Sequence, residues 1–484
     1  MPEHLLALDV GTTSARALIV GPTGLPAALA RRRVISHHPA PGLVEQDAGE
    51  VWRLAESAMA EALATAGLRA SDIAAIGVTS QRASIVLWDR NSGEPVAPMI
   101  VWSDLRGIAR AADLAAAGFP PWPQMPCAKL EAALDLLPDG RARAERGELA
   151  WGTLDSYLVW RLSGGDLHVT DFSNAWVSGY LDFAAPDRWN AGLLAFQNLP
   201  ERLFPRLTPS WGMLGTARAG CPGAPITALL ADQQAGLLAH GSLERGAWKA
   251  AFGTSAVVMV STGQLPFTPH PTMPLLALAR GGGRDLFCFE GMVASAGSFL
   301  EWLAGGLGLF PDVPALEAAA GQVRHAAGTA LRPSLQGLGA PHGRFDARAL
   351  IAGLTPATGR NELARAALEG LAFRVREIID VIAADGTIPL VPELSVDGGT
   401  SAGDVAMQIQ ADMLGRPLHR LALREGTALG AAFAAGLGVG LLTEADLPGL
   451  VRHDRTFEPA LTRDQSDAAY AAWRAALADT PVSG

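Results

Sequence analysis

The spacing of apolar and polar residues near the N-terminus predicts a short β-meander. One apolar run covers residues 5–10 and is interrupted only by Asp9, and a second covers residues 15–20. Short apolar runs bounded by turn residues are typical of buried strands. Residues 24–35 start with a glycine turn and then alternate, so we expect a third strand there. Gly11 and small hydroxyl residues separate the first two runs.

A helical spacing of apolar residues follows over residues 47–67. Asp47 is a residue type that caps helix N-termini, and Gly67 is the type that most often ends a helix. Residues 73–80 and 83–89 are apolar and contain several β-branched side chains, which predicts two more strands. Strands mixed with helices in this way indicate an α/β fold.

The second half of the chain repeats the pattern of two apolar runs separated by a glycine turn. Residues 248–262 form an apolar run, a turn of glycine and two hydroxyl residues, and another apolar run. Residues 368–385 have the spacing of an amphipathic helix, and residues 393–415 predict a strand, a glycine turn and a helix. Two similar hairpins, one in each half, suggest duplicated halves that face one another across a cleft.

The composition favours a large α/β enzyme with more than one domain. The chain has 484 residues, of which 49% are hydrophobic and 18% are charged, and this length allows about two to four domains. We place a domain boundary within residues 240–247, which divides the chain into residues 1–242 and 243–484. The net charge is −10 and no block of basic residues stands out, so nucleic acid is not an expected partner.

The cysteines and the longest uncharged segment bear on the expected location of the protein. Cys127, Cys221 and Cys288 are far apart in the sequence, which is typical of reduced thiols in a cytoplasmic protein. Residues 426–443 approach the length of a membrane span, but they are rich in glycine and alanine, so we predict a closely packed buried helix instead. We expect no signal peptide and no membrane partner.

Three glycine turns indicate a phosphate site. They lie at residues 11–14, 253–255 and 397–404, and each follows an apolar run. Backbone amides in such turns can hold phosphate oxygens, and glycine permits a close approach. Each turn alone also fits an ordinary hairpin or strand-to-helix turn. The three together favour a nucleotide site, where Asp9 suits Mg²⁺ held through water, with a turn-capping role as the alternative.

These turns and four further stretches resemble the FGGY family of carbohydrate kinases, and more closely its glycerol kinase branch. The further stretches are residues 77–106, 152–175, 229–241 and 427–440. The resemblance implies an α/β fold of two actin-like, ribonuclease-H-type domains, whose mixed five-stranded sheets flank a cleft for ATP and substrate. It implies a phosphotransferase with ATP and Mg²⁺ as cofactors, acting on a hydroxyl group of a small polyol or sugar.

The resemblance also implies a role for each matching residue. Residues 1–242 would carry the acceptor site, the first phosphate loop and the catalytic aspartate, and residues 243–484 the second phosphate loop and the nucleotide site. Asp232 would be the catalytic base and Asp9 the Mg²⁺-associated carboxylate. The acceptor would contact Arg82, Trp102, Asp232 and Gln233. The nucleotide would contact Thr12, Thr13, Ser14, Arg16, Gly253, Thr254, Gly297 and Gly399.

The physical chemistry of phosphoryl transfer fits these roles, because the reaction needs alignment, charge neutralisation and a base for the hydroxyl proton. Asp232 also fits the cap of a helix predicted over residues 232–241, and both roles are compatible.

Five residues depart from the pattern of the glycerol kinase branch. Ala83 stands where that branch has a glutamate, Gln124 where it has a tyrosine, and Val257 where it has an aromatic residue. These changes remove bulk or polar groups, so glycerol would leave its hydroxyls poorly paired. We therefore expect a larger acceptor, a polyol or ketose with four to six carbons. On the nucleotide side, Glu301 replaces a glutamine and Gly403 replaces an asparagine.

Three other functions stay open: glycerol kinase proper, an actin-like ATPase without an acceptor, and a sugar sensor without catalysis. The pair of Arg82 and Asp232 favours a kinase, because a switch ATPase needs a positioned water molecule but no acceptor-binding arginine. The expected partners are ATP and a small polyol or sugar, and both a homodimer and a homotetramer stay open.

Overall fold

Backbone contacts divide the chain into two units. The computed structural model describes residues 2–120, 122–264, 273–344, 346–384, 386 and 388–478. The first unit comprises Met1–Ser242, Leu276–Leu286 and Thr427–Val451. The second unit comprises Leu243–Leu275, Phe287–Gly426 and Arg452–Gly484. The chain therefore crosses between the units after Ser242 and returns twice to the first one.

The first unit contains a six-stranded mixed sheet. Its order is β11 (Trp211–Thr216), β12 (Pro225–Ala231), β5 (Ile73–Ser80), β1 (His4–Val10), β2 (Ser14–Val20) and β3 (Pro26–Arg33). Strand β1 pairs antiparallel with β2 and parallel with β5, and β5 pairs parallel with β12. The meander predicted for the N-terminus is thus confirmed as β1, β2 and β3.

A seven-stranded sheet repeats the same arrangement. Its order is β15 (Leu275–Gly281), β16 (Arg284–Val293), β14 (Ala256–Gly263), β13 (Trp248–Phe252), β19 (Leu394–Asp397), β20 (Leu418–Leu421) and β21 (His453–Phe457). The five strands from β16 to β20 have the order and directions of β3-β2-β1-β5-β12. This repeat supports the duplication that two hairpins suggested.

The expected fold class is confirmed, but the sheets are larger than the five strands expected. The extra strands extend the edges: β11 in one sheet, and β15 and β21 in the other. Strand β11 pairs antiparallel with β12, and β21 pairs antiparallel with β20. Each thus covers an open edge of the five-stranded core, which would otherwise expose unpaired backbone groups.

Smaller sheets and the helices complete the fold. The short strands are β4 (Glu45–Gln46), β6 (Ile85–Asp89), β7 (Met99–Ile100), β8 (Leu149–Thr153), β9 (Val169–Asp171), β10 (Arg206–Thr208), β17 (Ala330–Arg332) and β18 (Leu350–Ala352). The helices are α1 (Ala48–Ala66), α2 (Ile108–Ala116), α3 (Leu130–Asp135), α4 (Gly140–Glu145), α5 (Leu154–Ser163), α6 (Phe172–Ser178), α7 (Ala191–Gln197), α8 (Asp232–Leu238), α9 (Gly297–Glu301), α10 (Val313–Ala320), α11 (Arg360–Ala384), α12 (Asp404–Leu414), α13 (Gly426–Val439), α14 (Leu447–Leu450) and α15 (Arg463–Ala478).

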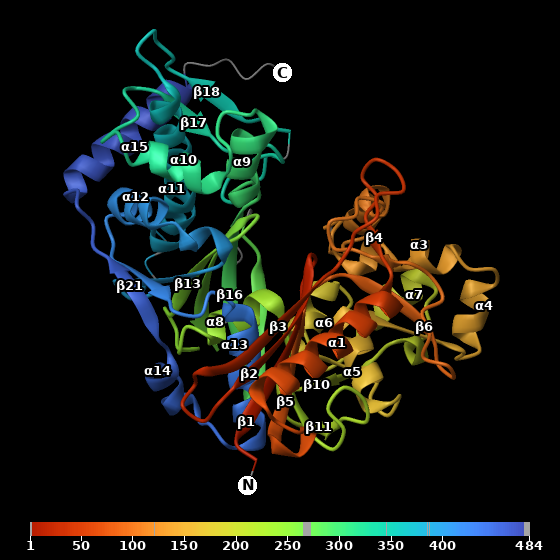
Figure 1. Cartoon of the computed structure of the whole chain (residues 1–484). Helices are drawn as coiled ribbons and strands as arrows, with labels where there is room; N and C mark the ends of the chain where they lie inside the picture. The colour runs from red at the N-terminus through yellow and green to blue at the C-terminus, as the bar shows by residue number, and fades with distance from the viewer. Residues whose placement is uncertain are drawn as a thin grey trace. The chain divides into compact units, whose positions relative to one another are not determined.

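Each unit has its own apolar core. Helix α1 packs on β2 and β3 in the first unit, and α11 packs between α10, α12 and β17 in the second (Figure 1). The ends of α1 confirm the prediction, because Asp47 accepts a hydrogen bond from the Glu50 amide and Gly67 has φ 67°. Helix α11 begins at Arg360, earlier than the predicted residue 368, and residue 385 lies outside the described residues.

The glycine-rich segment near the C-terminus is helix α13, as predicted, and it is packed closely in the first unit. A β-carbon on Gly430 would collide with the Ala235 carbonyl of α8, and one on Gly77 of β5 would collide with the Ala431 carbonyl. The small residues therefore let α13 approach α8 and β5. No helix among the described residues has the length and apolar character to cross a bilayer. The three cysteines are free and buried, as expected.

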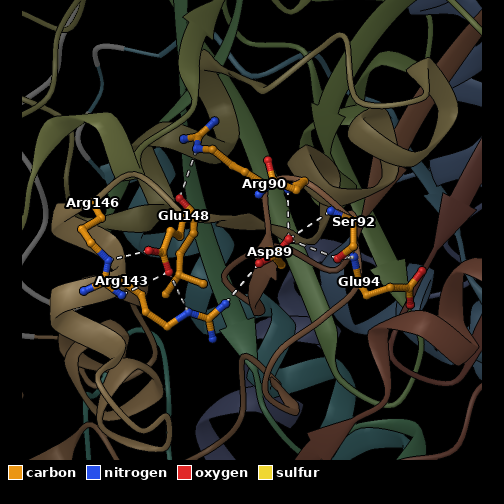
Figure 2. A network of polar contacts seen from close by, with 9 residues as sticks. Asp89, Arg90, Ser92, Glu94, Arg143, Arg146 and Glu148 are labelled. Carbon is orange, nitrogen blue, oxygen red and sulfur yellow. Dashed lines mark hydrogen bonds and ion pairs between the residues drawn. The ribbon is translucent and has the colours of Figure 1, made fainter.

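A polar network holds the turn after β6 (Figure 2). The Asp89 carboxylate accepts hydrogen bonds from the Asn91 and Ser92 amides, both at 3.0 Å, and pairs with Arg143 at 3.1 Å. Arg143 also contacts Glu148 at 3.3 Å. These hydrogen bonds, chiefly that of the Ser92 amide, hold the pKa of Asp89 below its usual value.

We expect Asp89→Ala to lower the midpoint of thermal unfolding at pH 7 by about 2–4 °C. The reason is the loss of about 1 kcal/mol of hydrogen bonding in this turn. Because the folded-state pKa is depressed, the contribution is present above the unfolded pKa and is lost as pH falls through the folded value. The deficit measured by circular dichroism should therefore shrink between pH 5 and the acid limit of folding. Asp89→Asn, which keeps an acceptor oxygen, is the control; an equal deficit for it at every pH would contradict this account.

Candidate active site

Three parallel strands of the first unit end side by side. The pairing register sets Val10 of β1 opposite Ser80 of β5, and Ser80 opposite Ala231 of β12. The residues that follow these strands are therefore brought to one edge of the sheet, where ligands bind in open α/β sheets. They include Gly11 in the first predicted phosphate loop, and Asp232.

The hairpin of β1 and β2 places Asp9 against Arg16. The two residues are register partners, and an Arg16 guanidinium nitrogen lies 2.8 Å from the Asp9 carboxylate. Asp9 is only 2% exposed, so the arginine compensates a buried charge. Sequence reasoning assigned both residues to the phosphate and metal site but did not predict their ion pair.

The residues around Asp9 fit one Mg²⁺ ion held partly by water. No three acidic, histidine or cysteine side chains gather into a metal cage anywhere in the described residues. Mg²⁺ commonly keeps several waters and binds one or two carboxylates together with substrate phosphates. A single buried carboxylate beside a glycine turn meets that requirement.

The hydroxyl residues of the first turn have different environments. Thr12 is half-buried, Thr13 is exposed and Ser14 is buried. The Thr12 hydroxyl donates to the Gln81 side chain at 3.1 Å and accepts from the Trp102 indole, also at 3.1 Å. The turn and the aromatic side chain predicted to contact the acceptor are thus joined directly by a hydrogen bond.

Arg82 and Asp232 lie together after the ends of β5 and β12. The Arg82 Nε lies 3.7 Å from an Asp232 carboxylate oxygen, which also accepts a hydrogen bond from the Gln233 amide at 2.8 Å. Helix α8 begins at Asp232, and Ala231 takes the cap position. Asp232 is therefore the first helical residue rather than the cap, and its side chain remains partly exposed.

Ala83 has an uncommon backbone conformation at this edge. Its φ is 62° and its side chain is 8% exposed. Non-glycine residues reach this left-handed region at a cost of about 1–2 kcal/mol, and such strain concentrates at functional sites. Gln124 lies half-buried in the loop before the turn Pro126–Ala128, and Val257 lies buried on β14 of the second unit.

Lys129, a buried residue that contacts the backbone of Trp102, was not identified from the sequence. Lys129 is completely buried, and its ammonium donates to the carbonyls of Val101 and Trp102, both at 3.2 Å. Burial lowers the pKa of Lys129 to about 7. The sequence gives no signal of this contact, because the partners of Lys129 are backbone atoms of a distant segment.

In the second unit, the second predicted phosphate loop meets two other predicted segments. The Gly253 carbonyl accepts from the Gly297 amide at 2.9 Å and from the Thr400 hydroxyl at 3.3 Å. The Thr254 carbonyl accepts from the Ser298 amide at 3.2 Å. A β-carbon on Gly297 would lie 2.5 Å from the Gly253 carbonyl oxygen, so glycine is needed for this approach.

The other residues that were predicted to contact the nucleotide lie near these segments. Gly399 begins the short helix Gly399–Ala402, and a β-carbon there would meet no atom within 4 Å. Glu301 is exposed at the end of α9. The space that a side chain on Gly403 would take is filled by the Glu317 carboxylate. Burial raises the pKa of Glu317 to about 7. Sequence reasoning missed this residue, since it comes from α10.

Comparison with known proteins settles the family. The profile of the "FGGY family of carbohydrate kinases, N-terminal domain" matches residues 4–239, and that of the C-terminal domain matches residues 248–439. The chain belongs to the FGGY family of carbohydrate kinases. A glycerol kinase from Aromatoleum aromaticum is 40% identical over 98% of both chains. As an FGGY kinase, the protein is an ATP-dependent phosphotransferase acting on a hydroxyl group, with Mg²⁺ as the usual cofactor.

Solved FGGY kinase structures share the fold. A glycerol kinase from Plasmodium falciparum with ADP has a TM-score of 0.90 at 23% identity, over 99% of both chains. A xylulose kinase from Rhodospirillum rubrum has a TM-score of 0.82 at 29% identity, over 98% of both chains. The same fold thus carries FGGY kinases named for different acceptors, so fold alone does not fix the acceptor.

Proposed function

We propose that this FGGY kinase phosphorylates a polyol or ketose with four to six carbons. The observation that carries the proposal is Ala83, next to Arg82 at the end of β5. Resemblance to the glycerol kinase branch implies a glutamate there that accepts a hydrogen bond from glycerol. Alanine cannot accept that bond and leaves more room for a longer acceptor.

In the proposed reaction the acceptor hydroxyl oxygen attacks the γ-phosphorus of ATP, and the bond to the β–γ bridging oxygen breaks. Asp232 accepts the hydroxyl proton, and Arg82, which lies beside the Asp232 carboxylate, binds acceptor oxygens. Trp102 forms an apolar wall, and Gln233, Gln124 and Val257 complete the acceptor site. Mg²⁺ near Asp9 would neutralise phosphate charge.

We assign the phosphate loops by the same reasoning. Thr12, Thr13, Ser14 and Arg16 would contact phosphates from the first unit. Gly253, Thr254, Gly297 and Gly399, with Glu301 and Gly403 farther along, would contact the nucleotide from the second unit. The assignment is supported by the contacts of the Gly253 carbonyl with the Gly297 amide and the Thr400 hydroxyl, which bring the three predicted segments together. We also propose a cytoplasmic location for this enzyme.

A second candidate function is glycerol kinase proper. It is favoured by the names of the relatives that are about 40% identical over nearly the whole chain. The two candidates differ only in the acceptor, so one assay separates them.

We expect ADP release from ATP–Mg²⁺ to be strongest with one acceptor among erythritol, five-carbon polyols, xylulose, ribulose, fuculose and gluconate, and weak with glycerol. We further expect Ala83→Glu to raise kcat/KM for glycerol by about 10–100-fold, because a hydrogen bond to a charged group contributes about 1.5–3 kcal/mol. Coupled-enzyme kinetics on each acceptor would measure both effects.

Ala83→Gln, which adds similar bulk at the same positive φ without the charge, is the matched control. Robust turnover of glycerol by the unmodified enzyme, with none of the longer acceptors, would establish the second candidate instead.

A further inference from the structure

A cluster of hydrogen bonds surrounds the buried carboxylate of Asp171 in the first unit. Asp171 follows Val169 and Thr170 in β9 and is completely buried. It accepts hydrogen bonds from the backbone amides of Ser173 and Asn174, each at 3.0 Å. These two bonds cap helix α6, so a local structural role explains them.

Three further bonds to Asp171 go beyond capping. The hydroxyl of Ser210 donates to it at 2.7 Å, the Asn174 side-chain amide at 2.9 Å, and the Ser173 hydroxyl at 2.8 Å. A buried carboxylate that accepts this many hydrogen bonds has its position fixed from several directions. Ser210 is tied in turn to Arg280, whose amide donates to the Ser210 hydroxyl at 3.0 Å.

The Ser173 hydroxyl connects Asp171 to the backbone next to the proposed base. The Ser173 hydroxyl donates a hydrogen bond to Asp171, and its oxygen accepts a hydrogen bond from the Ala231 amide at 2.9 Å. Ala231 is the last residue of β12 and directly precedes Asp232. The orientation of the Ser173 hydroxyl is therefore set by Asp171, and the backbone that carries Asp232 is held by that hydroxyl.

We propose that Asp171 is a positioning residue for Asp232 and acts through the Ser173 hydroxyl and the Ala231 amide. This inference rests on the proposed role of Asp232 as the base. A base must lie within hydrogen-bond distance of the proton that it removes, and small displacements are costly to the rate. Loss of the bridge should thus lower kcat and leave ligand binding nearly unchanged.

The decisive variant is Ser173→Ala, which removes the bridge and keeps the Asp171 carboxylate. We expect kcat to fall about tenfold or more, with KM for ATP and for the acceptor changed less than about threefold. Ser173→Thr, which restores a hydroxyl, should recover most of the rate. Asp171→Asn should lower kcat in the same way, since an amide nitrogen replaces one acceptor oxygen.

The matched control is Thr170→Val. Thr170 is buried in the same strand, but its hydroxyl donates to Asp155 at 2.8 Å. We expect Thr170→Val to lower the unfolding midpoint comparably and to leave kcat unchanged. Equal losses of kcat in Thr170→Val and Ser173→Ala at matched stability would overturn the inference, because the effect would then be general destabilisation of the buried network.

A double-mutant cycle with Asp232→Asn separates the inference from the proposed function. If Asp232→Asn is nearly inactive and Ser173→Ala reduces its residual rate no further, the positioning role is supported. If Asp232→Asn is nearly inactive while Ser173→Ala alone keeps full kcat, the inference fails and the proposed function stands. If Asp232→Asn keeps full turnover, the inference and the assignment of Asp232 as the base both fail, because there is no base at that position to orient.

Discussion

Asp232→Asn is expected to lower kcat for acceptor phosphorylation by about 10²–10⁴-fold, the usual contribution of a general base. An asparagine keeps the size of the side chain and can still accept the Gln233 amide, which bonds Asp232 at 2.8 Å in the native enzyme. It cannot take the hydroxyl proton. Binding of ATP, measured by isothermal titration calorimetry, should change little, because Asp232 is assigned no contact with the nucleotide.

The control for Asp232→Asn is Asp113→Asn in α2, which removes a carboxylate of similar chemistry from an exposed position paired with Arg110 at 3.5 Å. It should keep full turnover. A variant Asp232→Asn that retained more than about a tenth of kcat would contradict the assignment of the base. Loss of acceptor-dependent turnover with no change in acceptor-independent ATP hydrolysis would separate a kinase from the switch ATPase considered earlier.

Local patterns predicted the elements that carry the site because their signals lie within a few residues. The first two strands, the cap at Asp47 and the end of α1 at Gly67 depend on short-range periodicity and capping. These features needed no knowledge of tertiary contacts. The placement of Gly11 and Asp232 at one edge of the sheet does need it, because it depends on the pairing of β1 and β12 with β5 between them.

The contacts that organise the site were not predictable in the same way. Lys129 binds carbonyls of Val101 and Trp102, and Glu317 fills the space beside Gly403. Lys129 bonds to backbone atoms of a distant segment, and Glu317 fills a space beside a glycine of a distant segment. Neither contact produces a recognisable pattern in the sequence. The need for glycine at position 403 is explained only by the position of the Glu317 side chain, which comes from α10.

The strands added at the edges of the two large sheets were also not predicted from the sequence. The resemblance to the family implied a five-stranded core in each half, whereas β11, β15 and β21 are additions to its edges. Short antiparallel edge strands have weak, non-periodic sequence signals. Their presence is decided by which edges of each sheet need covering.

Asp9→Asn is expected to raise the Mg²⁺ concentration for half-maximal activity, and to lower kcat/KM for ATP, by about 10–100-fold, the range found for groups that act on a metal through water. The neutral amide cannot attract the hydrated cation as the carboxylate does. It can still accept from Arg16, so the hairpin of β1 and β2 should remain folded. Titration of activity with Mg²⁺ at saturating acceptor would measure the shift.

Asp104→Asn provides the comparison for Asp9→Asn, because Asp104 is another buried carboxylate paired with an arginine, Arg106 at 2.8 Å. Both variants lose one buried charge of an ion pair, so their unfolding midpoints should fall by similar amounts. Only Asp9→Asn should move the Mg²⁺ dependence. If both variants moved it equally, the effect would come from general destabilisation and Asp9 would have no specific role at the metal. If neither moved it, the carboxylate at the end of β1 would serve the turn alone, which was the alternative for this residue.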